Sequence, residues 1–116
     1  MLGNLYMRLH EVSRERDASG RPQYEAIVLI GWDATAGEYQ CLWLDSTGGG
    51  GLTAQGIARG KPDGDRIPFL WKEKNGSVSF NNTFIYDRRA GSWAWVMDNV
   101  QKGKPVPFGR VTLTRK

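Results

Sequence analysis

The sequence offers few side chains suited to catalysis. Asp45 ends an expected strand and precedes a run of glycines, so it is the one carboxylate placed for acid–base chemistry. The other aspartates fall mostly in expected turns, where the carboxylate bonds to nearby backbone N–H groups. Neither Ser46 nor Ser92 has a histidine that the sequence identifies as its base. We therefore expect a protein that is not an enzyme. The alternative is a weak enzyme that uses Asp45 or His10.

A metal or haem site is not expected either. His10 is the only histidine, Cys41 is the only cysteine, and no spacing of residues is typical of a metal site. Haem would take His10 as one axial ligand, but the sequence offers no second ligand. We therefore expect no cofactor. Cys41 has no partner for an internal disulfide, which favours a buried thiol in a reducing compartment, by default the cytoplasm.

Aromatic residues favour a binding function. Rings recur on nearly every expected strand. A barrel of about eight strands either fills its interior with side chains or encloses one small ligand. The rings therefore either form a solid core or wall a cavity for a small apolar ligand or an aromatic acid. The candidate ligand-binding residues are Trp32, Tyr39, Trp43, Trp71, Asn82, Phe84, Trp95 and Arg110.

Two of these candidates are polar residues on otherwise apolar faces. Asn82 alternates with Phe80 and Phe84, and Arg110 follows Phe108 at the same alternation. A side chain of either kind that points inward needs a partner, because an unpaired buried amide or charge is costly. The planar guanidinium of Arg110 suits a ligand carboxylate or phosphate. Without a ligand, the partner of an inward Arg110 would be an internal carboxylate such as Asp45. A shift of one residue in the assigned alternation would instead place the side chain on the outer face.

The elements that position these residues are predicted to be β-strands. Apolar residues alternate with polar ones at a period of two, and no segment has helical periodicity. The predicted strands cover residues 5–16, 23–32, 38–45, 52–59, 66–72, 77–86, 92–97 and 105–115. Two D-x-x-x-G segments, at 33–37 and 87–91, and an Asn-Gly pair at 75–76 indicate hairpin turns. The glycine run 48–51 is expected to be a mobile rim at the mouth of a barrel.

Short connections make neighbouring strands pair antiparallel, so we predict an all-β up-and-down meander of about eight strands in one domain spanning residues 1–116. Such a meander closes most readily into a lipocalin-like barrel, and a two-sheet sandwich is the alternative.

Several residues then resemble a bacterial lipocalin-like family, family 1579 of the domains of unknown function. The similar residues are Gly31-Trp32-Asp33, Gly37, Tyr39, Asp45-Ser46 and the closing Val111-Thr112 with Arg115-Lys116. The resemblance covers the chain from about Arg8 and implies a small calycin-type antiparallel barrel. Members usually begin with an extra strand containing Gly-x-Trp, which this sequence lacks. Either the native start lies upstream, or the barrel is short of one strand.

A barrel that lacks a strand would leave two sheet edges with unpaired backbone groups. Several strands are also apolar on both faces, which is unusual for a solvated outer surface. We therefore expect a homodimer. The functional alternative to ligand binding is a dimeric interaction module with a solid core.

The charge pattern favours neither nucleic acid nor membrane as a partner. The chain has a net charge of +4, but its Lys and Arg residues are spread over most segments. No apolar run approaches the length of a membrane span, and residues 1–6 lack the features of a signal peptide.

Overall fold

The computed structural model describes residues 2–3, 5–48, 52 and 56–115. These residues form eight strands in one antiparallel sheet, and each strand pairs with the next along the chain. The strands are β1 (Tyr6–Val12), β2 (Glu25–Asp33), β3 (Glu38–Asp45), β4 (Ile57–Gly60), β5 (Arg66–Lys72), β6 (Val78–Asp87), β7 (Ser92–Gln101) and β8 (Lys104–Leu113). The predicted all-β up-and-down meander is confirmed. Within the described ranges there is no helix that could span a membrane.

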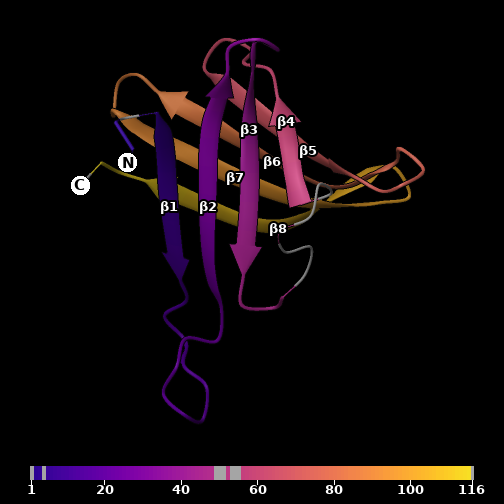
Figure 1. Ribbon diagram of the computed structural model, residues 1–116. Helices are drawn as coiled ribbons and strands as arrows, with labels where there is room; N and C mark the ends of the chain where they lie inside the picture. Colours follow the sequence, from indigo (N-terminus) through magenta and orange to yellow (C-terminus); the bar gives the residue numbers. More distant parts are fainter. Residues whose placement is uncertain (1, 4, 49–51, 53–55, 116) are drawn as a thin grey trace.

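The sheet curls into a half-barrel. Figure 1 shows β1–β4 in front, with the later strands crossing behind them. β1 and β8 are the two edges of the sheet and do not pair with each other. The half-barrel is therefore open along one seam, bounded by the free edges of these two strands.

Alternation along the strands produces one apolar concave face. In β2, Ala26, Val28 and Ile30 are buried and the residues between them are more exposed. The same alternation in the other strands brings together a single core, consisting of Val28, Ile30, Cys41, Ala58, Phe69, Phe84, Trp95 and Met97. Cys41 is fully buried, as the sequence predicts.

The two D-x-x-x-G turns have the same geometry. The backbone N–H of Gly37 donates to the carbonyl of Asp33 at 2.8 Å, and Gly91 donates to Asp87 at the same distance. Both glycines have a positive φ, 66° and 63°. Each aspartate side chain also accepts bonds from backbone N–H groups inside its turn. Both hairpin predictions are confirmed.

The last hairpin differs from the prediction. The strands predicted at 92–97 and 105–115 leave residues 98–104 as a polar loop, but β7 continues to Gln101 and β8 begins at Lys104. Lys102 and Gly103 alone make the turn, both with positive φ, 51° and 76°. This is the mirror-image turn that suits a two-residue hairpin, and a lysine in it gives no strong sequence signal.

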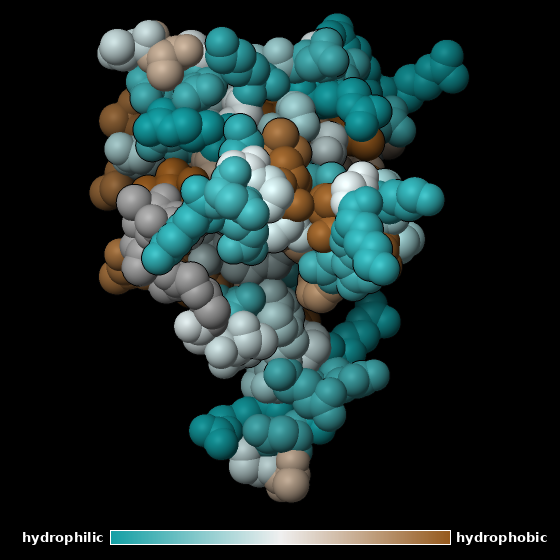
Figure 2. All heavy atoms as spheres, turned by 90° about the vertical axis from the view of Figure 1, so that its right-hand side faces the viewer, coloured by the Kyte–Doolittle hydropathy of each residue, from teal (hydrophilic) through white to brown (hydrophobic). Residues whose placement is uncertain are grey.

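Two further strands differ in their bounds. The strand predicted at 52–59 is β4, which is only Ile57–Gly60, and the described residue Leu52 lies in a turn. β1 ends at Val12 rather than near residue 16, and the chain continues as a narrow arm that returns to β2, held by bonds such as Ser13 N–H to the Tyr24 carbonyl, 2.9 Å. Figure 2 shows the arm at the bottom, covered by hydrophilic side chains. Apart from Gly48, the glycine run lies outside the described residues.

Candidate functional site

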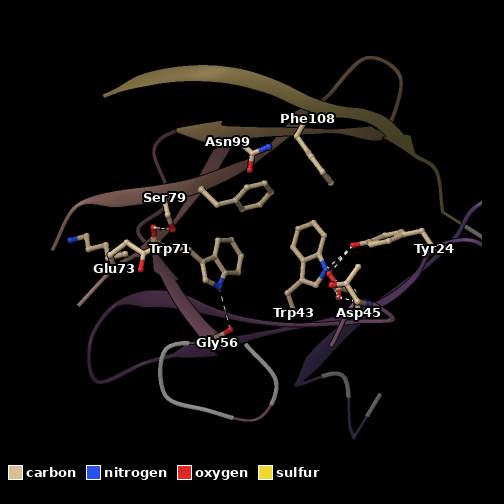
Figure 3. Close-up of a pocket in the computed structure, with 12 residues that line it drawn as sticks. Tyr24, Trp43, Asp45, Gly56, Trp71, Glu73, Ser79, Asn99 and Phe108 are labelled. Atoms are coloured by element: carbon tan, nitrogen blue, oxygen red, sulfur yellow. Dashed lines mark hydrogen bonds between the residues drawn. The ribbon is translucent and has the colours of Figure 1, made fainter. Parts of the chain in front are cut away.

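A pocket opens on the concave face of the half-barrel. Its volume is about 640 Å³, within the range of about 300–1,000 Å³ typical of small-molecule sites. Strands from both halves of the sheet contribute to it, as does the segment after β3 (Figure 3). The lining residues are Tyr24, Trp43, Asp45, Thr47, Gly56, Trp71, Lys72, Glu73, Ser79, Phe80, Asn99 and Phe108.

Four aromatic rings form the wall of this pocket. The ring centroid of Trp43 lies 6.0 Å from that of Trp71 and 5.6 Å from that of Phe80, with the ring planes nearly perpendicular. Phe108 meets Phe80 edge to face at 5.7 Å. Perpendicular contacts of this kind are favourable. Because all four residues also line the pocket, the wall offers ring surface to a bound molecule.

Hydrogen bonds connect the wall to a carboxylate. The indole N–H of Trp43 donates to the hydroxyl oxygen of Tyr24 at 3.1 Å, and that hydroxyl donates to Asp45 Oδ2 at 3.2 Å (Figure 3). Burial raises the pKa of Tyr24, and the negative charge of Asp45 adds to the rise. Tyr24 is therefore a neutral donor that holds the Asp45 carboxylate in place at the pocket wall.

Asp45 is fixed from its other side by Thr47. The backbone N–H of Thr47 donates to Asp45 Oδ1 at 3.0 Å, and the Thr47 hydroxyl donates to the same oxygen. This is the local bonding pattern of an aspartate that begins a turn. The interpretation of Asp45 as a carboxylate at the end of a strand is confirmed, and its position at the pocket is compatible with ligand binding.

Behind the pocket lie buried polar atoms with no partner. Asn82 is fully buried between Phe69 and Met97 of the neighbouring strands, and both of its amide atoms lack a hydrogen bond to any described residue. The same holds for Nε1 of Trp95, which lies diagonally opposite Asn82 on the same face. Asn82 therefore points inward, which is one of the orientations that the sequence left open.

The candidate residues from the sequence fall into three groups. Trp43 and Trp71 line the pocket. Trp95, Phe84 and Asn82 form the core behind it, with the ring of Trp95 5.2 Å from Trp43 and stacked on Phe84 at 5.3 Å. The third group, Trp32, Tyr39 and Arg110, lies elsewhere.

Trp32 and Tyr39 are at the opposite end of the half-barrel. They pair with each other next to the β2–β3 turn, with ring centroids 4.7 Å apart. Tyr39 is four residues from Trp43 along β3, roughly 13 Å at the rise of a strand. These two rings do not contribute to the pocket.

Arg110 lies on the convex face, which corrects the inward placement considered for it. It stands opposite Val96, and its guanidinium donates to Asp98 at 2.8 Å and to the Met97 and Gly109 carbonyls at the same distance. Met97 pairs with Gly109 but Asp98 pairs with Pro107, so a register shift lies between them and interrupts the alternation of faces along β8. Phe108 can therefore line the pocket although Arg110 does not.

Several residues that line the pocket are not among the candidates from the sequence. Tyr24 shares the alternation of Ala26 and Val28, so its inward direction was readable. Phe80 and Phe108 are aromatic residues on predicted strands but are not among those candidates. The predicted hairpin at Asn75-Gly76 brings Glu73 close to Ser79, but nothing in the sequence places Asn99 of β7 beside them.

Asp45 lines the pocket, but His10 and Cys41 are not among the lining residues. His10 is on the convex face, and its Nε2 is 2.6 Å from Glu25 Oε1. Burial raises the pKa of the Cys41 thiol to about 12, so the thiol stays protonated and unreactive at neutral pH. The described residues contain no group of three or more His, Cys, Asp or Glu side chains able to hold a metal ion.

Comparison with known proteins adds no identification: no family model, no curated protein and no solved structure matches this chain.

Proposed function

We propose that this domain is a lipocalin-like binding protein that takes a small, partly apolar ligand into the pocket on its concave face. The observation that carries the proposal is the open cavity of about 640 Å³, walled by Trp43, Trp71, Phe80 and Phe108. These rings contact one another edge to face and leave an open space of ligand size beside them, which supports a binding role over a solid core. A binding role also fits the chemistry, because the Asp45 carboxylate is held by Tyr24 and Thr47 rather than paired with a histidine. A reducing compartment such as the cytoplasm suits the buried free thiol of Cys41.

The test is calorimetric titration with small probes that have an aromatic or alkyl body, in neutral, anionic and cationic forms. At least one probe is expected to bind with saturation. Phe108→Ala should weaken that binding by about threefold to tenfold, the size of one lost aromatic contact.

Trp32→Ala is the matched control, because Trp32 and Phe108 are both half-exposed aromatic residues, at 50% and 55%, but lie at opposite ends of the half-barrel. It should leave the affinity unchanged. Absence of binding across the panel, or equal losses in both variants, would contradict the proposal.

A dimeric interaction module is a second candidate function, favoured by the open seam. The outer edges of β1 and β8 have no partner strand in the described part of the chain. Beside the β1 edge, Leu5 and Met7 are 70% and 51% exposed. A second copy that pairs with these edges would satisfy the backbone groups and cover the apolar side chains.

Light scattering distinguishes this candidate. The wild-type chain is expected to be a dimer at micromolar concentration, and Met7→Asp should shift it towards monomer. Ile57→Asp, at a similarly exposed residue of the interior strand β4, should not. A monomeric wild type removes this candidate.

A further inference from the structure

The hydrogen-bond donors around the pocket are almost all engaged within the protein. The indole N–H of Trp43 is given to Tyr24 and that of Trp71 to the Gly56 carbonyl at 3.3 Å. The hydroxyl of Ser79 donates to the Trp71 carbonyl at 3.3 Å. The hydroxyls of Tyr24 and Thr47 both donate to Asp45. Among the lining side chains, only Lys72 and Asn99 have donors for which no such bond is described.

Acceptors remain available at the same wall. A carboxylate has about four lone-pair sites, and among the described residues Asp45 Oδ2 receives a bond from Tyr24 alone. The carboxylate of Glu73 also lines the pocket. Figure 3 shows Asp45 and Glu73 on opposite sides of the two indoles. A ligand that supplies donors would therefore meet the carboxylates of Asp45 and Glu73, whereas a ligand that supplies only acceptors would have the donors of Lys72 and Asn99 alone.

The charge of the pocket is opposite to that of the chain. The chain carries +4, yet the charged lining residues are Asp45, Glu73 and Lys72, two acids against one base. No arginine is among the lining residues. Three arginines form ion pairs with carboxylates outside the pocket: Arg59–Glu38 at 3.0 Å, Arg88–Asp65 at 2.9 Å and Arg110–Asp98 at 2.8 Å.

The aromatic wall is suited to positive charge as well. The face of an indole or phenyl ring is negative, so a cation within about 6 Å of a ring centroid is attracted to it. Two indoles and two phenyl rings line this pocket beside the carboxylates. Ring faces and carboxylates thus favour the same kind of ligand.

We propose that the pocket selects an organic ammonium ligand, with N–H donors directed to Asp45 and an apolar body against Trp43, Trp71 and Phe80. This inference rests on the proposed binding function and specifies its ligand class. The aromatic acids expected from the sequence relied on Arg110, and that side chain lies on the other face.

The test is calorimetry with three probes of similar shape: 2-phenylethylammonium, the neutral 2-phenylethanol and the anionic 3-phenylpropanoate. The ammonium is expected to bind at least about tenfold more tightly than either of the others, from one charge-assisted bond and ring contact. Asp45→Asn should reduce this preference to about twofold or less. Asp63→Asn, in an exposed turn, is the matched control and should preserve it.

The outcomes separate the two proposals. If none of the probes binds, the binding function itself fails. If the alcohol binds as tightly as the ammonium, or the carboxylate more tightly, only the ligand class is overturned. If Asp45→Asn lowers the folded fraction, its affinities no longer report on the pocket alone. Glu73→Gln, at an exposed residue of the pocket rim, then tests the ligand class. It should lower the preference about threefold, and an unchanged preference contradicts the proposal.

Discussion

Asn82 is the one polar side chain that is fully buried in the described part of the chain. Its amide lies on the concave face among Phe69, Phe84 and Met97, with no hydrogen-bond partner in the described protein. Leaving such a group unpaired costs about 1–3 kcal/mol. Hydrophobic packing alone therefore does not explain the presence of Asn82 at this point of the interior.

Asn82→Leu is expected to stabilise the free protein by about 1–3 kcal/mol, because an apolar side chain of similar volume replaces the unpaired amide. Chemical denaturation measures the change. Asn81→Leu, at the half-buried neighbouring residue on the convex face, should change stability by less than about 0.5 kcal/mol. A clear loss of stability in Asn82→Leu would show that the amide has a bonding partner in the folded protein.

Glu11 gives a second residue-level prediction. It lies on β1 opposite the buried Ala26, and its Oε2 has no partner among the described residues. Burial raises the pKa of Glu11 above its ordinary 4.5. The folded state therefore binds more protons than the unfolded state just above that pH, and stability falls as pH rises through the raised pKa.

Glu11→Gln removes this titration. The variant should gain stability relative to wild type as pH rises from below 4.5 to neutral. Thermal melting across that range measures the difference. If the difference in stability between Glu11→Gln and wild type does not change with pH, it does not come from titration of the buried Glu11 carboxylate.

At the scale of elements, the sequence predicted strands and most turns correctly because local chemistry determines them. Alternating apolar residues define β2, and the Asp and Gly of the two D-x-x-x-G turns are required by side-chain bonds and positive φ. The Lys102–Gly103 turn was missed because the residues before it are polar and lysine rarely adopts positive φ.

The turn formed by residues 87–91 gives the prediction at this scale. Gly91 has a φ of 63°, and no atom lies near the position a Cβ would take. Gly91→Ala should therefore cost about 1–2 kcal/mol from backbone conformation alone. Gly91→Asn should cost less, because asparagine tolerates this conformation. Denaturation of both variants checks this, and an equal or larger loss in the asparagine variant would argue against a conformational cause.

The pocket was only partly predictable, for reasons that act between elements. Alternation gives the face on which a side chain lies but not its depth along the barrel, so Trp32 and Tyr39 were grouped with Trp43 although they are at the far end. A single register shift in the β7–β8 ladder also separated Arg110 from Phe108. Neither effect has a clear signal in the sequence.

At the scale of the whole molecule, the curled sheet explains how a small chain can build a pocket. Folding one half of a meander over the other brings β3 and β5 together with β6 and β8 around a common space (Figure 1). The open seam between β1 and β8 leaves the interior without a complete wall. The edge strand β8 supplies Phe108 to the pocket, whereas β1 supplies no lining residue.

The most direct test of ligand binding in this pocket uses the indole N–H signals of the five tryptophans in a ¹H–¹⁵N NMR spectrum. On addition of 2-phenylethylammonium, the signals of Trp43 and Trp71 are expected to shift with saturation, because both rings line the cavity. Trp32 and Trp93 should stay in place. No shift in any signal, or a shift of Trp32 as large as that of Trp43, would contradict the account.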